Sequence, residues 1–357
     1  MYKKEDKIKI SVGVITYNQE STIRQTLDSI LTQKGDFDLE LVIGEDCGTD
    51  ATHAICEEYS RQWNDEMSRD KSLNEPHTLN DGGKRVVKLL PNTHNLGIMA
   101  NFARVMKACS GDYIGMCAGD DYWCDELKLQ KQLEYFRAHP EVGVVTCAGC
   151  KLLVRSNKLV PNAVEPIHPA VDGNVKRFYF SKNYAGGLYA MPLTLLIKRD
   201  VLQYVDFDEF VKRGFPVEDL PMQAVMAQHA KWGHINDLCV VYRVYKESAT
   251  FISVEHPKYM LYHKGLAEIR RYLNELFPDD ICFTEDELQE QVFYKEFLLY
   301  LHRREYKKAK QLIADSRVLD HMPKVKQAIR FTKTWLHFMG AYYIKEQSYK
   351  KDINQRT

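Results

Sequence analysis

Short apolar runs alternate with amphipathic stretches through the first 150 residues of the chain. The apolar runs have the length of buried strands, and the stretches between them place apolar residues three or four positions apart, as on one face of a helix. Short connections between such elements favour a parallel sheet with right-handed crossovers. We predict strands at 8–16, 39–44, 86–90, 113–118 and 142–150, and helices at 22–32, 52–63, 98–109 and 127–138.

The pattern changes after residue 150. Residues 151–187 are mixed and rich in proline, so they predict no regular element. Further on, the pattern predicts a fold of the α/β class in 1–257, with a mainly parallel central sheet, and an α-helical region in 258–357. The later elements that we predict are strands at 193–198 and 239–245 and helices at 200–204, 222–231, 259–276, 284–302, 304–315 and 324–347.

Composition narrows the class of protein. The 357 residues are 45% apolar and 27% charged, which suits a sizeable core. Lys+Arg and Asp+Glu both number 49, whereas nucleic-acid binders usually show a basic excess, so we expect no nucleic-acid partner. Most of the nine cysteines lie in apolar runs, the N-terminus lacks an apolar signal core, and no run approaches the roughly 18 apolar residues of a membrane span. We therefore expect a cytoplasmic protein.

An acidic pair, Asp120-Asp121, follows the apolar run 113–118 and Gly119. Adjacent carboxylates at the end of a buried strand are costly unless something pairs with them, and ligands of α/β proteins bind at that edge of the sheet. Mg²⁺ and Mn²⁺ prefer oxygen ligands and accept phosphate as a further ligand. The pair therefore predicts a divalent metal site shared with a nucleoside diphosphate. The alternative is a turn that caps the following helix.

Polar groups also follow two other predicted strands, at Thr16–Asn18 and at Glu45–Asp46. The ends of parallel strands meet at one edge, so the three loops predict one convergent site. The chain has no glycine-rich dinucleotide motif and no phosphate loop. A diphosphate would then need another counter-charge, which a divalent ion on Asp121, with Asp120 as second ligand, would supply. Asp46 is placed to accept hydrogen bonds from a base or ribose.

With these motifs in place, the chain resembles a family 2 glycosyltransferase of the GT-A fold, a Rossmann-like sandwich, over most of its first 255 residues. The loop after strand two reads Glu-Asp-Cys-Gly-Thr-Asp, where the family usually has Asp-Asp-Gly-Ser-x-Asp, so Glu45, Cys47 and Gly48 depart from the pattern. The segments that carry the resemblance are Val14–Glu20, Glu45–Asp50, Asn95–Gly97 with Asn101 and Arg104, Ala118–Trp123, Val217–Leu220 and Tyr242–Arg243.

The resemblance implies a metal-dependent inverting transfer from a nucleotide sugar, in many relatives a UDP-sugar, to a hydroxyl of a glycan or lipid-linked acceptor in cell-surface polysaccharide synthesis. It implies Mn²⁺ or Mg²⁺ as cofactor and a hexosyl or N-acetylhexosaminyl group as cargo. Residues 1–125 would then bind the nucleotide sugar and 126–257 the acceptor. Asp219 would be the general base, with Glu218 as its orienter or substitute. The implied nucleotide-binding residues are Thr16, Tyr17, Asn18, Glu20, Asp46, Asn101, Arg104, Asp120 and Arg243.

Other readings of the same residues stay open. Glu218-Asp219 is also a common way to begin a helix next to Pro221, and Arg243 is also consistent with a surface arginine. A non-catalytic nucleotide-sugar or glycan binding module would use the same fold, although Asp121 and Asp219 favour an enzyme. Residues 303–333 hold ten basic and three acidic residues; they predict either peripheral association with an anionic membrane or the solvated face of a helical bundle.

Overall fold

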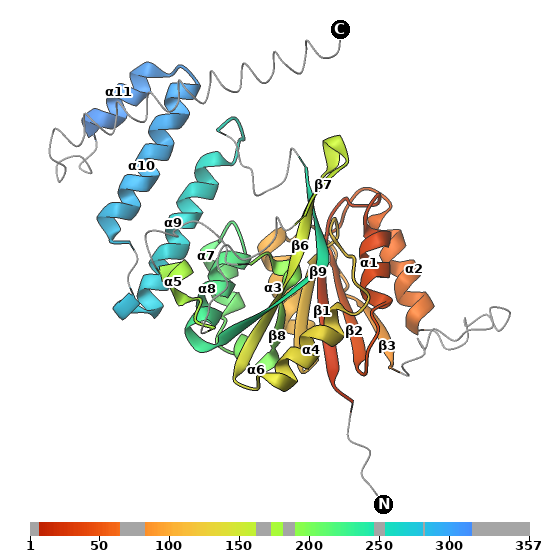
Figure 1. The fold of residues 1–357 in the computed structure, drawn as a ribbon. Coiled ribbons are helices and arrows are strands. Elements are labelled where there is room, and N and C mark those ends of the chain that lie inside the picture. The colour runs from red at the N-terminus through yellow and green to blue at the C-terminus, as the bar shows by residue number, and fades with distance from the viewer. Residues whose placement is uncertain are drawn as a thin grey trace, which may run out of the picture. The chain divides into compact units, whose positions relative to one another are not determined.

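The computed structural model describes residues 7–64, 83–161, 173–180, 190–245, 254–280 and 283–315. Its strands form one sheet in the order β3-β2-β1-β4-β8-β6-β9-β5, with β7 paired to β6 beside this path (Figure 1). The strands are β1 (Lys9–Thr16), β2 (Asp38–Glu45), β3 (Arg85–Leu89), β4 (Tyr113–Ala118), β5 (Tyr122–Trp123), β6 (Val142–Leu153), β7 (Lys158–Val160), β8 (Leu196–Lys198) and β9 (Lys231–Val244).

The first four strands form the parallel half of the sheet. β1 pairs with β2 on one side and with β4 on the other, and β2 pairs with β3. Both faces of β1 and β2 are largely buried, which explains why their sequences are mostly apolar instead of alternating. In the register of this half, Thr16 lies beside Glu45 and Ile15 beside Ala118, so β1, β2 and β4 end together.

The other half of the sheet mixes strand directions. β8 is antiparallel to β4 and β6, whereas the long strands β6 and β9 run parallel to each other. The two-residue strand β5 pairs antiparallel with β9, which places Tyr122 opposite Val241. The chain that leaves β4 therefore returns at once against the end of β9. This return brings Arg243 of β9 next to Asp120 and Asp121.

Helices cover both faces of the sheet (Figure 1). Apolar side chains of α1, α2 and α4 pack with β1 and β2 in one core cluster, and those of α3, α5, α7, α8 and α9 form the other. The helices are α1 (Ile23–Leu31), α2 (Thr52–Asn64), α3 (Ile98–Ala108), α4 (Lys128–Ala138), α5 (Lys176–Phe180), α6 (Arg199–Leu202), α7 (Phe207–Arg213), α8 (Asp219–His229), α9 (Tyr259–Leu276), α10 (Glu285–His302) and α11 (Tyr306–Asp315), with 3₁₀ turns η1 (Val154–Ser156), η2 (Pro192–Thr194) and η4 (Pro278–Asp280).

By its internal contacts the chain falls into two compact units. One comprises Met1–Ser253 with Leu261–Phe283, and the other Val254–Met260 with Thr284–Thr357. Ile269 and Leu273 of α9 belong to the core of the first unit. In the second unit a capping box at Thr284 begins α10. The predicted domain boundary at 257 stays a prediction. None of the described helices is long and apolar enough to cross a membrane.

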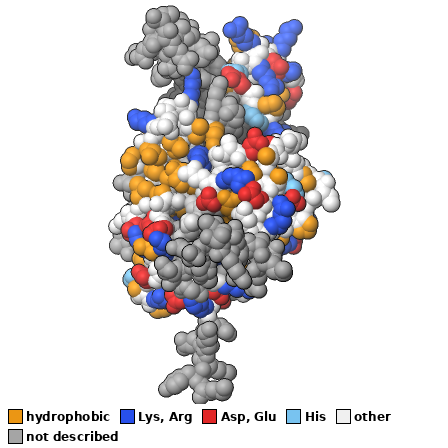
Figure 2. Space-filling model, turned by 90° about the vertical axis from the view of Figure 1, so that its right-hand side faces the viewer, with side chains coloured by type: hydrophobic (Ala, Val, Ile, Leu, Met, Phe, Trp, Pro, Cys, Tyr) orange, Lys and Arg blue, Asp and Glu red, His pale blue; other side chains and the backbone are white. Residues whose placement is uncertain are grey.

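Charge is mixed on the face shown in Figure 2, which lies on the right-hand side of Figure 1. Acidic and basic side chains are interspersed there, and hydrophobic side chains gather on part of the face. The mixture agrees with the equal numbers of basic and acidic residues in the sequence.

The predicted fold class, a mainly parallel α/β sheet followed by helices, is confirmed. Several boundaries were wrong. β9 begins at Lys231 instead of Cys239, and α8 begins at Asp219 instead of Met222. The strand predicted at 193–198 is limited to Leu196–Lys198, because the residues before it form the 3₁₀ turn η2. The first half of β9 is polar and partly exposed, so hydrophobicity alone did not reveal it. β5, β7, α5 and α7 were not predicted. The predicted helix at 324–347 lies outside the described residues.

Candidate functional site

The three predicted loops leave the sheet side by side. Beyond the paired strand ends, the backbone N–H of Asp46 donates to the carbonyl of Thr16 at 3.0 Å, and the N–H of Gly119 donates to the carbonyl of Ile15 at 3.0 Å. A side chain at position 119 would collide with Thr16, because a Cβ there would lie 2.5 Å from its Oγ1. Glycine therefore lets the third loop approach the first.

The first loop is tied to the second by side chains. Asn18, in the left-handed region at φ 52°, accepts at Oδ1 from the N–H of Thr49 at 2.7 Å. Glu20 accepts from the N–H of Ala51 at 2.8 Å, and its own N–H donates to Asp50 at 3.0 Å. Asn18 and Glu20, both predicted to bind nucleotide, thus brace the loop in this structure. Tyr17, which precedes them in the loop, is exposed.

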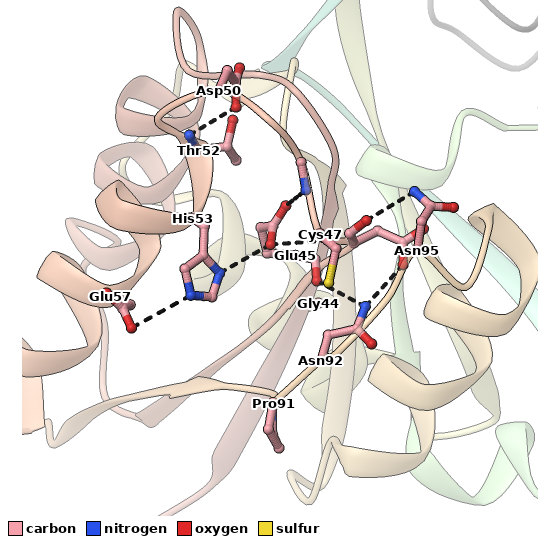
Figure 3. Close-up of polar contacts among 12 residues, drawn as sticks. Gly44, Glu45, Cys47, Asp50, Thr52, His53, Glu57, Pro91, Asn92 and Asn95 are labelled. Atoms are coloured by element: carbon pink, nitrogen blue, oxygen red, sulfur yellow. Dashed lines mark hydrogen bonds and ion pairs between the residues drawn. The ribbon is translucent and has the colours of Figure 1, made fainter.

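Glu45, the departure from the family pattern, lies buried under its own loop (Figure 3). Its carboxylate accepts from the N–H groups of Cys47 at 3.1 Å and Gly48 at 2.6 Å, and from Nδ1 of His53 at 3.0 Å. The other ring nitrogen of His53 lies 3.5 Å from Glu57 (Figure 3). Cys47 takes a left-handed conformation, φ 55°, which the hydrogen bonds to Glu45 hold in place.

Asp46 is 4% exposed and is held by the turn at 92–97. Its carboxylate accepts from Asn92 at 3.1 Å and from the N–H groups of Leu96 at 2.8 Å and Gly97 at 2.9 Å. Asn95 donates to the Asp46 carbonyl at 2.9 Å. Figure 3 shows Asn92 and Asn95 approaching the loop from the same side. Asp46 therefore fixes the turn that lies next to the strand ends.

Asn101 and Arg104 of α3 also donate hydrogen bonds to backbone carbonyls. Asn101 is buried and donates to the carbonyl of Gly44 at 2.7 Å. Arg104 donates to the carbonyl of Pro91 at 2.6 Å and to Asn101 at 2.9 Å. The two side chains connect α3 to the end of β2 and to the start of the turn. Their predicted contact with nucleotide stays a prediction.

Asp120 and Asp121 differ from these residues, because their carboxylates have few hydrogen-bond partners among the described residues. Asp121 is 3% exposed, and its carboxylate accepts one hydrogen bond from the described residues, from the N–H of Arg243 at 2.7 Å. Burial, reinforced by the charge of Asp120, raises the pKa of Asp121 well above its usual range. Burial also raises the pKa of Asp120. Thr26 donates to the carbonyl of Asp121 at 2.6 Å and thereby fixes the backbone under the pair.

Arg243 reaches the acidic loop from the end of β9. Its guanidinium donates to the carbonyl of Asp120 and to Oε1 of Gln25, and it lies 4.8 Å from the ring centre of Tyr122. Arg243 is 8% exposed, so the alternative of a surface arginine is wrong. Trp123 is buried beneath Lys128, whose Nζ lies 4.1 Å from the ring centre, so it anchors the loop.

Asp120 and Asp121 fit a divalent ion as a partial set of ligands. Among the described residues, no three His, Cys, Asp or Glu side chains come together as a metal site. Mg²⁺ and Mn²⁺ commonly take one or two carboxylates from the protein and complete their coordination with phosphate oxygens and water. The pair offers two carboxylates whose buried negative charge a cation would stabilise.

The second acidic pair, Glu218-Asp219, lies at the start of α8. Gly214, at φ 63°, ends α7 and allows the turn that leads to this pair. Asp219 accepts from the N–H of Leu220 at 2.7 Å, and Glu218 at the N-cap makes no side-chain capping bond. Burial raises the pKa of Asp219 to about 6, and burial with the charge of Asp219 raises that of Glu218 to about 8. Both groups are suited to exchange protons near neutral pH.

Sequence reasoning missed several residues of this region: Gln25, His53 and Asn92. Gln25 lies on the exposed face of a helix, where glutamine carries no signal of its own. Asn92 looks like an ordinary turn residue, and only the structure reveals its contact with Asp46.

A cavity of about 1000 Å³ lies at the other end of the sheet, where β4 begins and β8 ends. Its lining includes Tyr113, Lys198 and Phe207 and none of the residues of the three loops. Neither acidic pair therefore lines this cavity.

Comparison with known proteins shows what the chain is similar to. Residues 11–156 match the family model described as Glycosyl transferase family 2. The uncharacterized protein Rv1520 of Mycobacterium tuberculosis is 39% identical over 135 residues, 38% of this chain and 33% of that protein. The uncharacterized glycosyltransferase EpsJ of Bacillus subtilis is 32% identical over 158 residues, 44% of this chain and 38% of that protein. The chain thus spans a third or somewhat more of these relatives' lengths.

Two solved structures are similar to this chain at low sequence identity. TarS 1–349 of S. aureus, in complex with UDP-GlcNAc, is 17% identical with a TM-score of 0.49, covering 82% of this chain and 80% of that one. The mannosyltransferase PcManGT of Pyrobaculum calidifontis, in complex with GDP-Man and Mn²⁺, is 17% identical with a TM-score of 0.46, covering 93% and 81%.

Proposed function

Since residues 11–156 match the model of glycosyl transferase family 2, we propose that the protein is an inverting glycosyltransferase that moves a sugar from a nucleotide sugar to a hydroxyl group. The observation that supports this most strongly is the edge where β1, β2 and β4 end together. It combines two braced loops with Asp120 and Asp121, whose carboxylates have few partners among the described residues.

The donor would bind with its base and ribose against the first two loops and the turn at 92–97. Thr16 and the exposed Tyr17 border this edge, and Asp46 holds the turn in place. Asp120 and Asp121 would face the diphosphate. A divalent ion held by these two carboxylates would stabilise the charge that develops on the leaving diphosphate. Arg243 adds a buried positive charge beside them.

The acceptor hydroxyl would attack the anomeric carbon from the face opposite to the diphosphate, so that the new C–O bond forms as the bond to the diphosphate breaks. Asp219 would take the hydroxyl proton. Its raised pKa makes it a stronger base than an ordinary aspartate, while still ionised at neutral pH. Attack on the far face inverts the anomeric centre. Glu218 beside it, with its pKa raised to about 8, would stay mostly protonated at neutral pH, so that the pair carries a single negative charge.

Finer features belong to the same proposal. We expect a uridine nucleotide, a hexosyl or N-acetylhexosaminyl group, and a glycan or lipid-linked acceptor of a cell-surface polysaccharide. A protein with such acceptors would work in the cytoplasm, at the inner face of the membrane. The basic helix α11 would provide peripheral contact with that surface.

A thermal-shift screen tests the proposal directly. Nucleoside diphosphates and nucleotide sugars are added with Mn²⁺, with Mg²⁺ or with a chelator. A ligand at 100 times its Kd stabilises the folded protein by about 2.7 kcal/mol, so we expect a clear rise in melting temperature that requires the metal.

The screen also separates the alternatives. If no nucleotide raises the melting temperature, the proposed function is wrong. If GDP or a dTDP-sugar stabilises the protein and uridine nucleotides do not, only the choice of base is wrong. A non-catalytic binding module would bind the donor but show no sugar transfer. Its donor affinity would not depend on Asp219.

A further inference from the structure

Arg243 is a nearly buried cation beside two buried carboxylates, yet it forms no ion pair with a described carboxylate. Its side-chain partners among the described residues are neutral: the carbonyl of Asp120, the Oε1 atom of Gln25 and the face of the Tyr122 ring. Its backbone N–H, not its side chain, contacts the Asp121 carboxylate. The guanidinium of Arg243 therefore lies near Asp120 and Asp121 without forming an ion pair with either carboxylate.

This arrangement needs a cause, because a guanidinium and a carboxylate attract strongly. Opposite charges at contact distance attract more strongly inside a protein than in water, and arginine binds carboxylates with two parallel hydrogen bonds. Without other partners, Arg243 would be expected to turn onto Asp120 or Asp121. Such an ion pair would occupy the oxygens that a divalent ion needs.

Gln25 is the side chain that opposes this movement. It projects from α1, on the other side of the acidic loop, and accepts from the second terminal nitrogen of Arg243. The first terminal nitrogen donates to the Asp120 carbonyl, and Tyr122 supports the flat face of the group. With both ends of the guanidinium fixed, its rotation toward the carboxylates is blocked.

We propose that Gln25 is a positioning residue that withholds Arg243 from Asp120 and Asp121, so that these carboxylates stay available to a divalent cation. The inference rests on the proposed function, because it assigns the pair to a cation. Gln25 itself contacts neither the cation nor the substrate. It lies outside the acidic motif, and nothing in the sequence links it to Arg243, 218 positions away.

The test is a titration of Mn²⁺ alone, followed by the loss of the free-ion signal in electron paramagnetic resonance, and repeated with UDP present. Gln25→Ala removes the acceptor for Arg243, and we expect Mn²⁺ affinity to fall about tenfold. Gln25→Glu keeps an oxygen acceptor for the guanidinium and should bind Mn²⁺ within about threefold of the wild type. Because Gln25 is exposed, neither variant is expected to unfold the protein.

Two controls sharpen the test. Gln62→Ala removes a comparable exposed helix glutamine, which donates to Glu58 at 3.2 Å, and should leave Mn²⁺ affinity unchanged. In an Arg243→Gln background, Gln25→Ala should have no further effect, because its action passes through the guanidinium.

The outcomes distinguish the inference from the proposal beneath it. If the wild type binds Mn²⁺ and Gln25→Ala binds it equally well, the inference is overturned and the proposed function stands. Equal losses in Gln25→Ala and Gln25→Glu would also overturn it, because the acceptor oxygen would then be irrelevant. If the wild type binds neither Mn²⁺ nor UDP, both the cation site and the proposed function are wrong.

Discussion

Two pairs of adjacent carboxylates lie at the same edge of the sheet, Glu45-Asp46 at the end of β2 and Asp120-Asp121 just after β4. The side chains of the first pair accept six hydrogen bonds from within the first unit, from two backbone N–H groups and one side chain each. Within the described part of the chain the carboxylate of Asp121, although equally buried, accepts one, and Asp120 has a side-chain hydrogen bond with Gln19. Both pairs look like short acidic turns in the sequence. The structure distinguishes them by the number of hydrogen-bond donors that surround each pair.

The difference indicates which carboxylates shape the protein and which are left for a ligand. Buried polar groups are normally satisfied, so a buried carboxylate with few partners calls for an explanation. Glu218-Asp219, which is partly buried, resembles the second case, since its side chains accept one hydrogen bond from the described residues, from the N–H of Leu220. We therefore propose that Glu45-Asp46 serves loop architecture, Asp120-Asp121 the cation and Glu218-Asp219 proton transfer.

The largest effect is expected from Asp219→Asn. An amide cannot accept the proton of the acceptor hydroxyl, and loss of a general base typically costs on the order of 10²–10⁴ in rate. Donor affinity should stay within a few-fold, because a base acts in the transition state. The measurement is transfer of labelled sugar from the nucleotide sugar to a membrane or polysaccharide fraction, with donor affinity measured in parallel.

Glu218→Gln is the matched control for this variant. If it abolishes transfer while Asp219→Asn does not, the base is Glu218. If both variants keep near-normal transfer, neither residue is the base and the mechanism proposed here fails.

The next effect tests the structural role of the first pair. Asp46→Asn exchanges a charged acceptor for an amide whose NH₂ group faces other donors, and hydrogen bonds to charged groups are worth about 1.5–3 kcal/mol each. We expect a loss of about 3 kcal/mol in the free energy of unfolding, measured by urea denaturation. Asp121→Asn should be neutral or stabilising in the same assay without metal. Equal losses in the two variants would remove the distinction between the pairs.

A smaller effect concerns pH. The pKa of Glu218 is raised to about 8 in the folded protein, so the folded state holds this proton more tightly than the unfolded chain. Its influence on stability is most favourable below about pH 4 and is lost as the pH rises toward 8. Glu218→Gln should therefore raise the melting temperature at pH 8.5 by on the order of 2 °C, and have little effect at pH 4. The reverse pH dependence would contradict the raised pKa.

The smallest effect is expected in the second unit. Lys307, Lys308 and Lys310 of α11 are exposed, and each basic residue near an anionic membrane contributes about 1 kcal/mol. Reversing the three charges to Glu should weaken binding to phosphatidylserine vesicles and leave donor affinity unchanged. Unchanged vesicle binding would favour the alternative, a solvated basic face.

Much of the parallel half was predictable from the sequence, because its strands are buried on both faces and its connections are short. The strand at 113–118 has the predicted bounds. The later half was less predictable. α7 has an Asp206 N-cap and a Gly214 C-terminal cap that sequence reasoning overlooked, and β5 consists of two residues whose pairing with β9 depends on tertiary contacts.

The site shows the same limit. Its location at the strand ends followed from the sequence, since Thr16, Glu45 and Ala118 each end an apolar run. The use of each polar side chain did not follow. Asp46 and Asp121 look alike in sequence, and only the positions of Asn92 and Arg243, distant along the chain, decide how many partners each carboxylate has.

The central claim is that Asp121 holds a divalent ion through which the diphosphate of the donor binds. Calorimetric titration of UDP into the wild type and Asp121→Asn, each with Mn²⁺ and with a chelator, tests this most directly. We predict that Mn²⁺ strengthens UDP binding to the wild type at least tenfold, and that Asp121→Asn shows the same weak affinity in both conditions. Metal-dependent UDP affinity that is unchanged in Asp121→Asn would contradict the account.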